Sequence, residues 1–175
     1  MINEVLSALQ SHLKTPGLAG VSDIEVTPGK FDASELARQS LRPPALRLCF
    51  LGAAKSKAAP NEERRFDAAF SVFIVTEAKA RGPLGVQIGE WVVDRVILWP
   101  VSQLVRGAGI PRDLRFDALY TSEIDQRGIA LHAVSWVQSV RLGLDEIDAG
   151  PHDPTALGPV GVDLEQTLAG GLGNG

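Results

Sequence analysis

The segment from Phe66 to Glu77 constrains the fold more than any other part of the chain. As a strand, it would turn Phe70 and Ile74 toward one side and Phe73 and Val75 toward the other. Apolar residues on both faces are typical of a strand that is covered on both sides. The sequence therefore predicts an interior strand around which the other elements are arranged.

A long apolar helix is predicted after this strand, from Pro83 to about Leu98. Gln87, Glu90 and Asp94 share a narrow polar stripe, and nearly all the other positions are apolar. A helix that lies on one sheet needs an apolar arc of only about 100° or somewhat more. We therefore expect this helix to bury a second side against another helix or another subunit.

The remaining periodic segments predict two more helices and four more strands. The helices are expected at 2–13 and 34–40, and the strands at 21–26, 45–51, 114–120 and 129–142. The predicted fold class is α+β, in the order α-β-α-β-β-α-β-β, with helices packed on a mostly antiparallel sheet. Residues 1–142 form one domain in this prediction, and the Gly- and Pro-rich residues 143–175 form an irregular C-terminal arm.

Two further segments are predicted to lack long regular structure. Residues Gly52 to Arg64 carry no apolar period and are predicted to be a mobile loop between two strands. Residues Val101 to Val105 are predicted to form a short turn before Gly107-Ala108-Gly109.

Composition excludes several classes of protein. The 175 residues carry a net charge of -4, so the basic footprint of a nucleic-acid-binding protein is absent. No signal peptide and no apolar run of about 20 residues is seen, so we expect neither secretion nor a membrane span. The single cysteine, Cys49, lies in a predicted strand, where a buried inert thiol is the usual finding.

The residues that carry chemistry are not grouped in any familiar pattern. His12, His132 and His152 have no Cys, Asp or Glu at the spacing of a metal site. A triad of His132, Ser135 and Asp125 would lack the glycines of a nucleophile elbow. We therefore expect no catalytic residues, no metal and no cofactor, and we do not expect an enzyme.

Charged residues beside loops and the large aromatic residues of the long helix are the candidates for contacts between subunits. Basic pairs such as Arg64-Arg65 could meet acidic clusters such as Asp145 to Asp148 on a neighbouring subunit. The predicted interface residues are Lys55, Lys57, Arg64, Arg65, Trp91, Trp99, Arg112, Arg115, Asp145 and Glu146.

Features spread along residues 1 to 142 together resemble a known family. They are the opening helix with Ile2, Val5, Leu6 and Leu9, the Pro28-Gly29 turn, the Arg42-Pro43-Pro44-Ala45 approach to a strand, the Phe70-Ser71-Val72-Phe73-Ile74-Val75 strand, the long helix around Trp91, and Trp136-Val137-Gln138 in the last strand. In this order they resemble the tail-terminator proteins, or minor tail proteins, of Mu-like and lambda-like tailed phages and prophages.

The resemblance implies a structural role in the virion tail, after synthesis in the host cytoplasm. Such proteins form a homo-oligomeric ring, commonly a hexamer, on the head-proximal end of the tail tube. The ring stops polymerisation of the tail tube protein and joins the tube to the head-tail connector and head-completion proteins, with a channel through which DNA can pass. We expect lateral contacts through the apolar helix, the 52–64 loop, the C-terminal arm and the sheet edges.

Two alternatives remain open at the level of sequence. One is a head-completion or tube-adaptor connector protein of the same particle, which would also form a ring. The other is a small ferredoxin-like ligand-binding domain, which would need a closed pocket with converging polar groups.

Overall fold

The computed structural model describes residues 1–27, 31, 42–55, 65–77, 83–119 and 128–141. The chain divides into two units, Met1–Gly143 and Leu144–Gly175, and every described residue belongs to the first unit. The predicted helix at 34–40 and the predicted C-terminal arm lie outside the described residues.

The described elements follow the predicted order. The helices are α1 (Ile2–Lys14), α3 (Pro83–Ile97) and α4 (Val101–Leu104), and the strands are β1 (Asp23–Val26), β2 (Ala45–Lys55), β3 (Arg65–Glu77), β4 (Ala108–Leu119) and β5 (Ile129–Arg141). The fold class is α+β, as the sequence predicted.

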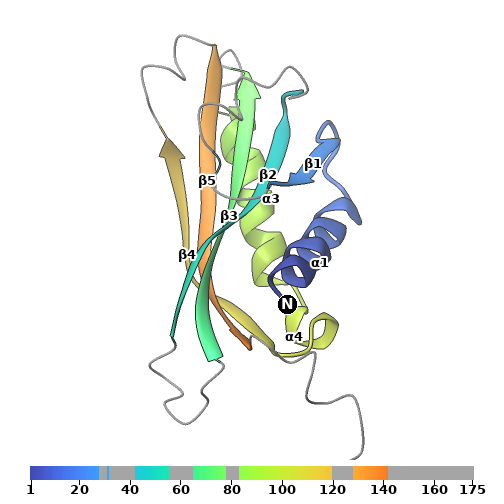
Figure 1. Ribbon diagram of the computed structural model, residues 1–175. Coiled ribbons are helices and arrows are strands. Elements are labelled where there is room, and N and C mark those ends of the chain that lie inside the picture. The colour runs from blue at the N-terminus through green and yellow to red at the C-terminus, as the bar shows by residue number, and fades with distance from the viewer. Residues whose placement is uncertain (28–30, 32–41, 56–64, 78–82, 120–127, 142–175) are drawn as a thin grey trace, which may run out of the picture. The chain divides into compact units, whose positions relative to one another are not determined.

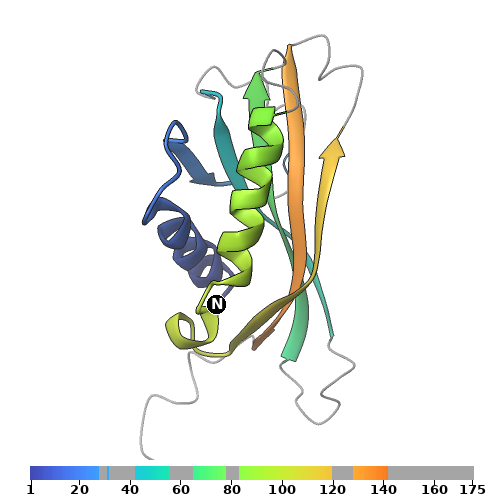
Figure 2. The ribbon, with the colours of Figure 1, turned by 180° about the vertical axis from the view of Figure 1, so that it is seen from behind.

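The strands form one five-stranded sheet in the order β1-β2-β3-β5-β4 (Figure 1). Strand β1 pairs with β2 in parallel, and the other three pairings are antiparallel. Strand β3 is at the centre, with β2 on one side and β5 on the other, which confirms its prediction as an interior strand. Helices α1 and α3 lie on the same face of the sheet (Figures 1 and 2).

The main core lies between the helices and the sheet. Phe70 on β3 and Trp136 on β5 are directly paired in the register, and their rings stack with centroids 5.9 Å apart. Both side chains are buried, as are Leu9 and Leu13 on the inner side of α1. Because side chains alternate along a strand, every second residue of β3 and β5 points into this core.

A second, smaller cluster lies on the opposite face of the sheet. Val75 is buried although its neighbour Ile74 points into the main core, so β3 buries residues on both faces over this stretch. Phe31 stacks on Phe73 there, with ring centroids 5.1 Å apart. The two-sided apolar pattern of β3 is therefore matched by packing on both faces.

Two element boundaries differ from the sequence-based prediction. The predicted loop from Gly52 to Arg64 is wrong at its start, because β2 runs to Lys55 and stays paired with β3 beyond a register shift at Phe50/Gly52. Residues 56–64 lie outside the described part of the chain. Strand β4 begins at Ala108 rather than at Leu114, because irregular pairing with β5 accommodates the glycine and proline residues that resembled a turn.

The edge strand β4 is irregular over its first half. Its register against β5 shifts twice, between Ala108 and Pro111 and again between Arg112 and Arg115. Asp113 has a positive φ of 56°, a conformation that aspartate tolerates better than most residues. Bulges, an edge proline and charged side chains all hinder pairing with a further strand. The expectation that sheet edges extend into neighbouring subunits is therefore disfavoured over this half of β4.

Two glycines allow α3 to approach the sheet closely. A Cβ atom at Gly85 would lie 2.5 Å from Cε1 of His132, and one at Gly89 would lie 2.1 Å from Cζ of Phe116. His132 is buried, whereas Phe116 is 37% exposed. The imidazole has little space to move into, and the phenyl ring can turn toward solvent.

We expect these two glycines to respond differently to alanine. Gly85→Ala should lower the free energy of unfolding by about 1–3 kcal/mol, because overpacking against a buried ring costs more than the helix propensity gained. Gly89→Ala should also destabilise the fold, but by less, because the Phe116 ring that a Cβ would meet is partly exposed and can shift toward solvent. Urea unfolding of both variants beside the wild type measures this, and equal effects of the two substitutions would contradict the close approach at His132.

Candidate interaction surface

Large apolar side chains are exposed where α3, α4 and β4 follow one another. Ile97 is 62% exposed, Leu98 72%, Leu104 59% and Ile110 72%. Scattered exposed apolar residues are ordinary on a protein surface, but four within fourteen residues of one chain segment (97 to 110) are a concentration of the kind that marks interaction sites. This segment is the candidate functional surface of the described domain.

The outward side of α3 combines apolar and acidic residues. Val86, Glu90, Asp94 and Ile97 are three or four positions apart and so share one side of the helix. All four are exposed. We call these four residues the acidic helix surface. The sequence predicted that this helix buries a second side against another helix or another subunit, and α3 contacts α1 as well as the sheet.

Two exposed arginines lie near the start of β4 and at the end of β5. Arg106 and Arg141 are both exposed, and the backbone N–H of Arg141 donates to the carbonyl of Gly107 at 3.0 Å. Leu104 and Ile110 flank Arg106 in the chain and are also exposed. Because Val140 points into the main core, the next residue, Arg141, points to the opposite face of the sheet.

Sequence reasoning overlooked several exposed residues near α4 and at the ends of β4 and β5. Arg106, Ile110 and Arg141 were not among the predicted contacts. The signal that was available is Ile110, a large apolar residue between Gly109 and Pro111, in a segment that resembled a turn.

The two tryptophans predicted at the interface differ in burial. Trp91 is half-buried and packs against the main core. Trp99 is 3% exposed and belongs to that core. Trp99 therefore packs inside the domain. Its burial does not support its prediction as an interface residue.

Three of the predicted arginines lie on β3 and β4. Arg65 donates from Nη1 to Oγ of Ser139 at 3.3 Å. Nη2 of Arg112 lies 2.8 Å from Oδ1 of Asp67, and Nη2 of Arg115 lies 3.5 Å from Oδ1 of Asp117. Ion pairs as exposed as these two contribute little to stability. Both arginines therefore remain accessible to a partner. Lys55 ends β2, and Lys57, Arg64, Asp145 and Glu146 lie outside the described residues.

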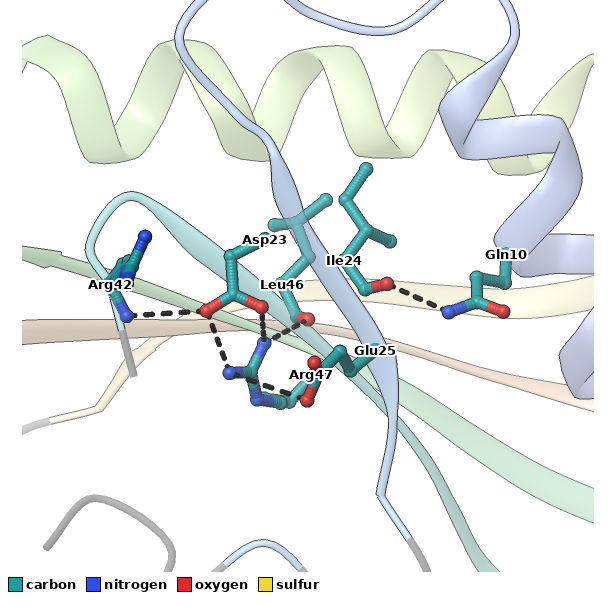
Figure 3. Close-up of polar contacts among 7 residues, drawn as sticks. All are labelled: Gln10, Asp23, Ile24, Glu25, Arg42, Leu46 and Arg47. Atoms are coloured by element: carbon teal, nitrogen blue, oxygen red, sulfur yellow. Dashed lines mark hydrogen bonds and ion pairs between the residues drawn. The ribbon is translucent and has the colours of Figure 1, made fainter. Parts of the chain in front are cut away.

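A buried ion pair fastens β1 to β2 (Figure 3). Arg47 donates from Nη1 to Oδ1 of Asp23 at 2.7 Å and from Nη2 to Oδ2 at 2.8 Å. The backbone N–H of Arg42 donates to the same Oδ2 at 3.2 Å. The side chains of Arg47 and Asp23 are only 6% and 14% exposed, so this bidentate pair is largely withdrawn from water.

The environment of Asp23 favours its charged form. Burial by itself would raise the pKa of the carboxyl group, but the hydrogen bonds from Arg47 and from the Arg42 backbone outweigh it. The pKa of Asp23 is therefore lowered. The pair is an internal fastening of the sheet rather than a binding site, because its charges are already matched.

A polar cluster joins the C-terminal ends of α1 and α3. Arg95 donates from Nη2 to the carbonyl oxygens of His12 and, at 2.7 Å, of Thr15. In return Nε2 of His12 lies 3.0 Å from the carbonyl oxygen of Arg95. The imidazole also stacks on Trp99, with ring centroids 6.4 Å apart. These contacts satisfy carbonyls that a helix end leaves unpaired.

The same cluster disfavours the charged form of His12. Burial lowers the pKa of the imidazole, and the nearby Arg95 guanidinium lowers it further. The hydrogen bond to the Arg95 carbonyl raises the pKa but does not outweigh these effects. Nη2 of Arg95 also lies 3.4 Å from Nδ1 of His12, a contact that suits a neutral ring accepting at Nδ1. The neutral imidazole is therefore the form that joins the two helices.

Metal ligands and the conceivable catalytic triad are the remaining candidates among the described residues. Within them, no group of three or more His, Cys, Asp or Glu side chains could hold a metal ion. His132 and Ser135 are three positions apart on β5 and so point to opposite faces of the sheet, which separates two members of the conceivable triad. Asp125 lies outside the described residues. None of the described helices is long and apolar enough to cross a bilayer.

No model of a known protein family matches the chain, and no curated protein matches its sequence.

Removal of Asp23 should strongly destabilise the fold. Asp23→Ala leaves the buried Arg47 guanidinium with only the longer contact of its Nη2 to Oε2 of Glu25, at 3.8 Å, and we expect a loss of about 3 kcal/mol in the free energy of unfolding. The double variant Asp23→Leu/Arg47→Met should lose less than Asp23→Ala alone, because it leaves no buried charge. Chemical denaturation of both variants measures this, and a double variant that is the less stable of the two would refute it.

Protonation of His12 should weaken the contact between α1 and α3. Because the folded-state pKa lies below the unfolded value, the unfolded chain binds the proton more readily, and stability falls as the pH drops through about 6.5. Thermal unfolding at about pH 7.5 and about pH 5 should show a larger loss for the wild type than for His12→Gln, whose amide can still donate to Arg95. Equal losses in the two proteins would contradict this account.

Proposed function

We propose that this protein is a structural subunit of a phage tail, the tail terminator, which forms a ring at the head-proximal end of the tail tube. The observation that carries the proposal is the concentration of exposed apolar side chains at Ile97, Leu98, Leu104 and Ile110. A subunit that works alone has no use for such a surface, whereas a subunit of a ring buries it against neighbours.

The architecture supports the same proposal. The resemblance to tail terminators implies one α+β domain, and the described residues form an α+β domain with helices on one face of the sheet. The features that carry the resemblance include the β3 strand around Phe70, the α3 helix around Trp91 and the β5 strand around Trp136, and these three elements pack together in the main core. The pattern that prompted the resemblance is thus the packed centre of the domain.

The ferredoxin-like alternative receives less support. In a split βαβ arrangement a further strand lies between the two parallel strands. In this sheet the parallel strands β1 and β2 are immediate neighbours.

Native mass and tube length together test the proposed function. The protein is purified and measured alone and after addition of the tail tube protein of the same phage or prophage, with negative-stain images of both samples. We expect rings, and tubes that are capped at one end and limited in length. As a control, Ile97→Asp/Ile110→Asp should remove both effects while the chain stays folded, because it places charges in the apolar surface.

Two other outcomes would contradict the terminator assignment. A protein that stays monomeric or dimeric and leaves tube growth unchanged would favour a small ligand-binding domain. A ring that forms without limiting tube length would favour a connector elsewhere in the particle.

A further inference from the structure

We draw no further inference here: the strongest candidate, the acidic helix surface on the outward side of α3, is an unpartnered helix face, and nothing in the described part of the chain shows what covers it.

Discussion

The structure depends above all on the uninterrupted pairing of β3 with β5. The two strands match residue for residue, from Arg65 opposite Arg141 to Glu77 opposite Ile129, without a shift in register. Because side chains alternate along a strand, a slip by one residue would exchange the two faces of the sheet. The regular ladder is what places Phe70 and Trp136 together under α3 and keeps Ser71 and Ser135 together on the other face.

The remaining elements adapt to this ladder. Helix α3 approaches it through Gly85 and Gly89, and α1 is tied to α3 by the cluster of His12 and Arg95. Strand β1 is held at one edge of the sheet by the buried pair of Asp23 and Arg47. At the other edge, β4 follows β5 only with two shifts in register. Irregularity is thus concentrated at the edge where the exposed apolar residues gather.

Charge is distributed unevenly on a chain whose net charge is only -4. Some charges are matched internally, as in the pair of Arg47 and Asp23, and these stabilise the fold without offering a site. Others, such as Glu90 and Asp94 on α3, are exposed beside apolar side chains. The second group is the one that can distinguish between partners, because exposed charges at the border of an apolar surface select orientation and repel wrong pairings.

The sequence by itself determined the local structure and which side chains share a face. The period of two in β3 and β5 and the helical period in α1 and α3 predicted those elements and most of their buried residues, because side-chain direction follows from backbone geometry alone. Tertiary structure alone decided the strand order, the burial of Arg47 beside Asp23, the burial of Trp99 and the two register shifts of β4. The exposure of Leu104 and Ile110 belongs with these features. Each depends on which distant segment lies alongside, and a local pattern of apolar and polar residues does not specify that partner.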